Sequence, residues 1–215
     1  MKEKKSVIYT VGEEIFNSVS HGVGVCLSVA ALVLLVAFAV LRSNGFGIAS
    51  ALVYGISLIL LYTMSMVYHI VSHPTAKRVL RIFDHCSIFI LIAGTYTPYL
   101  LMCMSGPMRW VMFGLIWGAT VIGILLNAIN LERFEKLSMA CYIAMGWAIV
   151  FTIRTIVERV ALPGVILLVA GGVVYTLGII FYALKKYRYM HSIWHLFVLG
   201  GSVCHYLSIL IYVIK

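Results

Sequence analysis

The chain alternates between long apolar runs and short polar connectors. Seven of the runs are long enough for the roughly 20 residues that a membrane-spanning helix needs. They are continuously apolar, whereas the strands of a membrane barrel would alternate. We predict helices near 18–41, 46–71, 83–104, 109–128, 137–158, 162–184 and 190–214. Because no connector is long enough for a second domain, the pattern predicts an all-α membrane protein in which residues 1–215 form a single seven-transmembrane helix bundle.

Composition supports a lipid environment. The chain is 63% hydrophobic and 11% charged, whereas a soluble domain carries about 25% charged residues and about 45–50% apolar ones. A soluble protein must still cover its surface, so a large core does not explain the excess. The basic N-terminal tail precedes an apolar run that is too long for a signal-peptide core and lacks a convincing cleavage site. We therefore expect the first helix to remain in the mature protein.

The basic residues are divided unevenly between the two ends of the predicted bundle. Eleven of the sixteen Lys and Arg residues lie in the N-terminal tail and the second, fourth and sixth connectors, namely Lys2, Lys4, Lys5, Lys77, Arg78, Arg81, Arg133, Lys136, Lys185, Lys186 and Arg188. The other five are Arg42, Arg109, Arg154, Arg159 and Lys215. Since basic loops favour the cytoplasm, we predict a multi-pass protein of the cell's inner (plasma) membrane, with the N-terminus cytoplasmic and the C-terminus outside. Anionic lipid accounts for the net charge of +9, so no nucleic-acid partner is needed.

Polar side chains recur where three predicted helices reach the cytoplasmic face. Ser65 and His69 lie four residues apart near the end of the second helix, and His191 and His195 do so at the start of the seventh. Residues four apart share one face of a helix. Asp84 falls in the first turn of the predicted third helix. Because ionisable groups inside a membrane are costly and usually functional, we expect one site near the cytoplasmic leaflet.

The first helix adds a polar stripe to this end of the bundle. At about 100° per residue, its members fall on one face, and they are Glu14, Asn17, Ser18 and His21.

Three further histidines are expected to lie outside the site. His73, beside Pro74, is expected in solvent, and His85 is expected to face the headgroups. His205 lies about 21 Å from His191 along the helix axis, at about 1.5 Å per residue, so the two cannot share an ion.

The histidine spacing suits a metal. Imidazole suits zinc, and a catalytic zinc site commonly has three protein ligands and a water. His191 and His195 offer two nitrogens from one helix, His69 offers a third, and Asp84 would hydrogen-bond the water or a ligand on the metal. The five cysteines show no C-x-x-C spacing, so neither a thiolate site nor a disulfide framework is indicated. Each histidine alone also fits an interhelical hydrogen bond, and the pattern leaves both interpretations open.

Four segments together resemble a known family. They are "EEIFNSVSHGVG", "SMVYH", "FDHCSIFILIAGTYTPY" and "HSIWHLFVLGGSVCHY". The resemblance is to the hemolysin III proteins, bacterial members of the progestin and adipoQ receptor (PAQR) superfamily, which is distantly related to alkaline ceramidases. It runs from Glu13 to Tyr206 and implies a seven-helix bundle with zinc near the cytoplasmic face. By motif, it implies three zinc ligands, an aspartate that contacts zinc through water and a nearby serine, namely His69, His191, His195, Asp84 and Ser65.

The function that the resemblance implies is zinc-dependent hydrolysis of a lipid amide, such as a ceramide, with membrane lipids as the partners. Asp84 would be the general base or would position the water, and Ser65 would hydrogen-bond the developing oxyanion or the metal's water. Two other classes stay open. The family name points to a pore-forming cytolysin, and a sensor or regulator of membrane lipid state would use zinc structurally.

Overall fold

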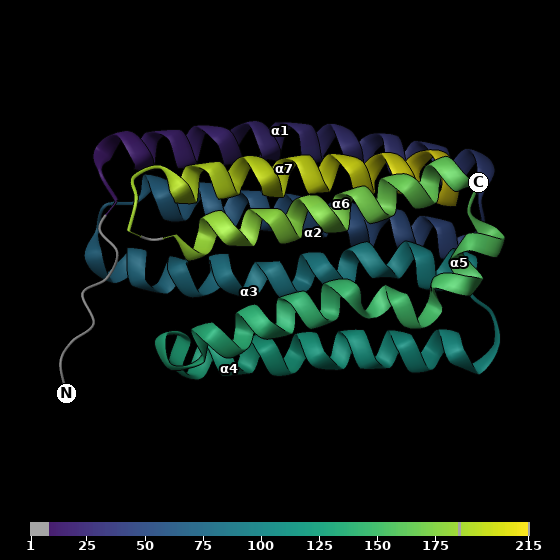
Figure 1. Cartoon of the computed structure of the whole chain (residues 1–215). Helices are drawn as coiled ribbons and strands as arrows, with labels where there is room; N and C mark the ends of the chain where they lie inside the picture. Colours follow the sequence, from purple (N-terminus) through teal and green to yellow (C-terminus); the bar gives the residue numbers. More distant parts are fainter. Residues whose placement is uncertain (1–8, 185, 215) are drawn as a thin grey trace.

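A computed structural model of the chain describes residues 9–184 and 186–214, and every regular element in these ranges is helical. The long elements lie side by side in an elongated bundle (Figure 1). They are α1 (Val11–Arg42), α2 (Gly45–Ile70), α3 (Pro74–Pro98), α4 (Gly106–Trp147), α6 (Leu162–Ala183) and α7 (Met190–Ser208), with a short α5 (Ile153–Arg159). Tyr99–Cys103 and Ile209–Val213 are π-helical turns that extend α3 and α7, and Ala148–Thr152 is a 3₁₀ turn between α4 and α5.

Six helices within the described ranges are long and apolar enough to cross a membrane. The longest stretch, Gly106–Arg159, has 54 residues. At about 1.5 Å per residue it would measure about 80 Å as one straight helix, far more than a hydrocarbon core of about 30 Å. Its backbone leaves helical geometry at Asn130, with φ −161° and ψ 91°, and Figure 1 shows α4 folding back on itself. The predicted segments 109–128 and 137–158 are the two arms of this stretch.

Two helices begin earlier than the sequence predicts. α1 begins at Val11, not near residue 18, because Thr10 and Glu13 form a reciprocal capping box. α3 begins at Pro74, not near 83, with His73 as its N-cap. Proline suits the first turn of a helix, where its missing N–H costs nothing. Asp84 therefore lies almost three turns inside α3, which corrects the predicted place in the first turn.

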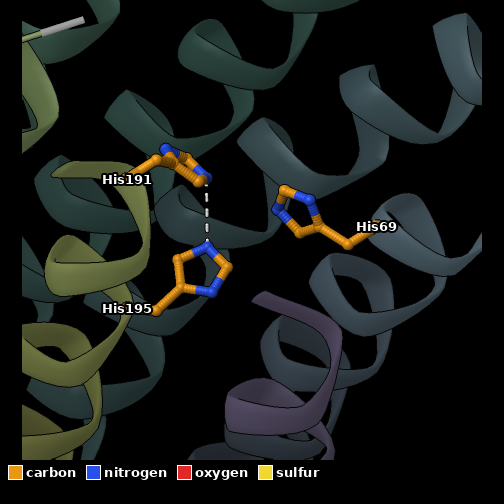
Figure 2. A group of neighbouring side chains, drawn as sticks. All are labelled: His69, His191 and His195. Atoms are coloured by element: carbon orange, nitrogen blue, oxygen red, sulfur yellow. Dashed lines mark hydrogen bonds between the residues drawn. The ribbon is translucent and has the colours of Figure 1, made fainter. Parts of the chain in front are cut away.

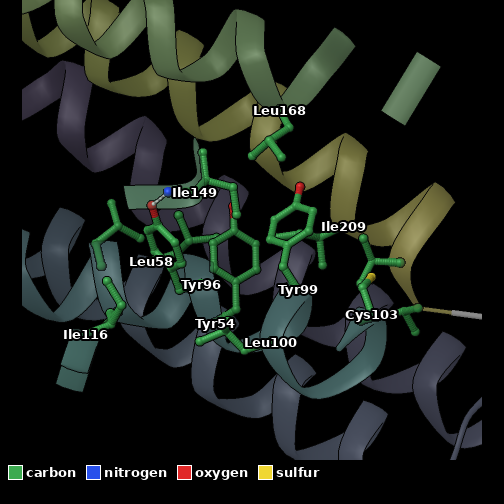
Figure 3. Close-up of a cluster of buried hydrophobic side chains, with 14 of the residues drawn as sticks. Tyr54, Leu58, Tyr96, Tyr99, Leu100, Cys103, Ile116, Ile149, Leu168 and Ile209 are labelled. Carbon is green, nitrogen blue, oxygen red and sulfur yellow. Dashed lines mark hydrogen bonds between the residues drawn. The ribbon is translucent and has the colours of Figure 1, made fainter. Parts of the chain in front are cut away.

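Large apolar side chains cover the outside of the bundle, and tyrosines fill much of its inside. Outward side chains such as Val33, Leu115 and Phe151 are exposed, as expected for a surface in lipid. In the core, Tyr96 and Tyr99 are buried among aliphatic side chains (Figure 3). The Tyr99 hydroxyl donates to Ser208 Oγ at 2.8 Å, and the Tyr96 hydroxyl donates to a backbone carbonyl at 3.1 Å. Buried hydroxyls need such partners because no water reaches them.

The ends of five helices meet at one end of the bundle. α1, α3 and α7 begin there and α2 and α6 end there, at the left of Figure 1. This arrangement brings together the segments that carry the predicted polar site. Some members of the predicted basic sets lie outside the described residues, namely Lys2, Lys4, Lys5, Lys185 and Lys215.

Candidate metal centre

Three histidines from two helices meet at this end of the bundle. His69 is in the last turn of α2, and His191 and His195 occupy the first two turns of α7. One ring nitrogen from each lies within 4.8 Å of the others, a grouping that could hold a metal ion. Figure 2 shows the three rings pointing toward a common space, with His191 Nε2 3.0 Å from His195 Nε2. The spacing of four residues on α7 places both rings on the face that meets α2.

A carboxylate on α1 orients His69. Glu14 Oε2 accepts a hydrogen bond from His69 Nδ1 at 2.5 Å, and Glu14 Oε1 lies 2.9 Å from Lys77 Nζ. Lys77 also donates to the carbonyls of Tyr68 and Val71 at the end of α2, at 3.0 Å and 3.1 Å. A cation at this position satisfies carbonyls that the helix leaves unpaired. One chain of contacts therefore joins α1, α2 and α3 behind the imidazole.

The remaining nitrogen of His69 fits a metal. With Nδ1–H donated to Glu14, Nε2 presents a lone pair, and this buried atom has no hydrogen-bond partner among the described residues. Leaving a buried polar atom unpaired costs about 1–3 kcal/mol. Histidine ligands usually donate their other ring N–H to a carboxylate or carbonyl, which fixes the tautomer. The donor set of three imidazoles is one that zinc and several other transition metals accept.

His195 is held from the side of α1. Its Nδ1 lies 3.4 Å from Ser20 Oγ, so its Nε2 is the nitrogen that faces the cluster. The ring of His21 stacks on it, with centroids 3.6 Å apart and an interplanar angle of 15°. Asn17 is fully buried between the two helices, where its Oδ1 accepts a hydrogen bond from Ser192 Oγ at 2.6 Å.

The stripe predicted on the first helix is correct for Glu14, Asn17 and His21 and wrong for Ser18. The Ser18 hydroxyl turns back to the carbonyl of residue 15, and Ser20 reaches the cluster in its place. A helix has 3.6 residues per turn, so i+3 and i+4 positions both fall near one face. Whether Ser18 or Ser20 points toward the cluster depends on how α1 is rotated against α7.

Ser65 and Asp84 line a cavity beside the cluster. The cavity has a volume of about 150 Å³, and His191, His195 and His21 line it as well. It reaches as far as His205 on α7, about 21 Å beyond His191 at about 1.5 Å per residue. Most of the remaining lining is apolar, from residues such as Leu61, Ile88, Ile92, Met139, Ile143, Trp194 and Val198. The arrangement places a narrow apolar space next to a group of ionisable side chains.

Three predicted positions are settled by their contacts. His85 is buried, so the expectation that it faces the headgroups is wrong; its Nδ1 lies 2.9 Å from the Arg81 carbonyl. His73 is exposed, as predicted. His205 contacts the Leu168 carbonyl through Nε2 at 3.0 Å and is not a member of the metal-compatible group.

Comparison with known proteins agrees with the motifs. The haemolysin-III related family matches residues 9–206. Hemolysin-3 of Bacillus cereus is 41% identical over 204 residues, which cover 95% of this chain and 93% of that protein. The hemolysin-3 homolog of Bacillus subtilis (strain 168) is 38% identical over 208 residues, covering 97% of this chain and 98% of that one.

A human protein extends the relationship to the superfamily. The monocyte to macrophage differentiation factor of Homo sapiens is 30% identical over 172 residues, which cover 74% of this chain and 68% of that protein. Together with the apolar helices and the histidine cluster, these matches show that the chain is a multi-pass membrane protein that belongs to the haemolysin III family of the PAQR superfamily.

Proposed function

We propose that this protein is a zinc-dependent hydrolase that cleaves an amide bond in a membrane lipid. The observation that carries the proposal is the junction between the histidine cluster and the apolar cavity, which His191 and His195 both line. A lipid acyl chain suits the apolar part of such a cavity. The bond that joins the chain to its headgroup would then lie beside Asp84 and Ser65.

The residues divide the chemistry among them. Zinc held by His69, His191 and His195 would polarise the substrate carbonyl and acidify a water molecule. Asp84 would take a proton from the attacking water on a carboxylate oxygen and return it to the amine nitrogen as the C–N bond breaks. The products would be a fatty acid and an amine. Ser65 is buried, and its hydroxyl would donate a hydrogen bond to the carbonyl oxygen as negative charge develops there.

The proposal includes a membrane topology. We propose that the two arms of Gly106–Arg159 cross the membrane separately, so that a single domain has seven spans. The N-terminus would lie in the cytoplasm, the C-terminus outside, and the site near the cytoplasmic leaflet of the inner membrane. The non-helical backbone at Asn130 and the uneven division of basic residues support this arrangement.

Two other functions are kept as candidates. The names of the Bacillus relatives favour a cytolysin that forms pores. The cluster's place between α2 and α7 favours a sensor or regulator of membrane lipid state, in which zinc only joins helices.

One preparation tests all three candidates. The protein purified in detergent is analysed for bound metals by mass spectrometry. It is then incubated with ceramides and other N-acyl lipids, and the products are separated and identified by their mass. About one zinc per chain with release of fatty acid supports the hydrolase. Zinc without turnover favours the regulator. Leakage from protein-containing vesicles, without either zinc or turnover, favours the cytolysin and contradicts the main proposal.

A further inference from the structure

A second cavity adjoins the metal centre and differs in character from the first. Its volume is about 290 Å³, and it lies among the start of α1, the first half of α3 and the connection from α6 to α7. His85, Tyr182 and His191 line both cavities. We call the second cavity the vestibule, and its lining residues used below are Tyr9, Glu13, Arg81, Lys186 and Arg188.

The described lining of the vestibule has an excess of positive charge. Arg81, Lys186 and Arg188 contribute three cations, of which Arg81 also pairs with Glu132 at 3.8 Å, and Glu13 is the one acidic residue in the described lining. The Glu13 carboxylate is already engaged, because Oε1 accepts from the backbone N–H of Tyr189 at 2.7 Å and Oε2 accepts from Thr10 at 2.8 Å. Arginine and lysine are the side chains with which proteins bind phosphate groups. The charge of the vestibule therefore suits an anion.

Neutral groups in the vestibule suit an anion as well. Tyr9 packs against the ring of His191, with centroids 4.9 Å apart, and its hydroxyl can donate a hydrogen bond. α7 begins at the vestibule with Met190, and its N-cap residue Tyr189 makes no side-chain capping bond. The positive end of the helix dipole adds to the field there.

We propose that the vestibule binds the phosphate-type headgroup of the lipid whose acyl chain lies in the apolar cavity. Because His191 lines both cavities, a molecule with its head in one and its chain in the other would place its linkage at the histidines. The substrate is then an anionic N-acyl amphiphile and not an uncharged ceramide. This assignment of the substrate class rests on the proposed hydrolase function.

Binding measurements test the assignment without turnover. The full-length protein in an uncharged detergent is titrated with a single-chain lipid phosphate, with the monoacylglycerol of the same chain, and with inorganic phosphate, and Kd is read from tryptophan fluorescence. We expect the lipid phosphate to bind at least about tenfold more tightly than the other two. Equal affinity for the two lipids would overturn the proposal. Binding of inorganic phosphate as tight as that of the lipid phosphate would assign the vestibule to free phosphate and would also overturn it.

Two matched variants locate the charge. Lys186 and Arg188 are exposed on the connection before α7, so Lys186→Gln/Arg188→Gln should fold, and it should weaken lipid-phosphate binding about tenfold or more while leaving the monoacylglycerol unchanged. Arg78→Gln/Arg133→Gln removes the same charge from exposed positions that do not line the vestibule and should change neither affinity. A loss of binding that is the same in both variants would reflect net charge and would contradict a specific site.

The headgroup assignment and the hydrolase function can fail separately. If the lipid phosphate binds as expected but no amide is cleaved, the result contradicts the hydrolase function and supports the headgroup site. If a ceramide is cleaved as fast as its phosphorylated counterpart, the result supports the hydrolase function and contradicts the headgroup site.

Discussion

Glu14 Oε2 and His69 Nδ1 lie 2.5 Å apart, although 55 residues separate them in the chain. This contact directs the unpaired Nε2 of His69 toward His191 and His195. It links the first helix of the protein to a cluster formed by the second and the seventh.

Removing the Glu14 carboxylate should weaken metal binding without removing a ligand. We expect Glu14→Gln to lower zinc affinity about 10–100-fold, because the His69 tautomer and ring orientation are no longer held. Competition with a fluorescent chelator measures the affinity. Glu158→Gln is the matched control, since Glu158 pairs with Arg154 at an exposed position. Equal affinities in the two variants would mean that Glu14 does not act through the metal.

Substitutions of the histidines on α7 should affect zinc binding differently according to their position. His191→Ala/His195→Ala should reduce bound zinc from about one per chain toward zero and lower the unfolding temperature, because the metal joins two helices. His205→Ala should also lower the unfolding temperature, since it removes a contact between helices with the Leu168 carbonyl, yet it should keep its zinc. Metal analysis and thermal unfolding are done on the same samples. Normal zinc content in the double variant would refute the assignment of the ligands.

Asp84 and Ser65 should affect turnover more than metal content. If hydrolysis occurs, Asp84→Asn should slow it by about 10²–10⁴-fold, the usual contribution of a general base, with most of the zinc retained. Ser65→Ala should also slow the reaction and keep the zinc. Product release under single-turnover conditions measures the rates. Loss of zinc in Asp84→Asn as complete as in the histidine variants would identify Asp84 as a direct ligand.

Small residues at helix contacts should be sensitive to added volume. A Cβ at Gly171 would lie 2.2 Å from the His205 ring, whereas one at Gly118 meets nothing within 4 Å. Overpacking commonly costs about 1–3 kcal/mol, so Gly171→Ala should lower the unfolding temperature in detergent by several degrees. Gly118→Ala should leave it unchanged or raise it slightly, because alanine favours the helix. Similar temperatures for both variants would contradict the packing of α6 against α7.

Sidedness can be measured with single cysteines in a background without the five native ones. Thr75→Cys and Lys186→Cys lie at the end of the bundle that carries the histidines, and Gly45→Cys lies at the other end, where a side chain has open space. An impermeant thiol reagent should label only Gly45→Cys in intact cells and all three after permeabilisation. The reverse pattern in intact cells would show that the site faces outward.

The class of the fold and part of the site follow from short stretches of the sequence. Continuous apolar runs with few charges require a lipid solvent, and in lipid the backbone must satisfy its own hydrogen bonds, so the runs become helices. The pairing of His191 with His195 is likewise local, because residues four apart on a helix share a face whatever surrounds it. These features depend on the composition and period of short stretches of chain.

How the helices face one another depends on the packing of the whole bundle. That His69 Nε2 points at the α7 pair, that Ser20 reaches His195 where Ser18 does not, and that His85 is buried all depend on the rotation of each helix about its axis. The rotation of each helix is set by packing between helices far apart in the sequence. A local sequence pattern therefore does not predict it. The vestibule arises in the same way, because its positive charges come from α3 and from the connection before α7, which meet only in the folded bundle.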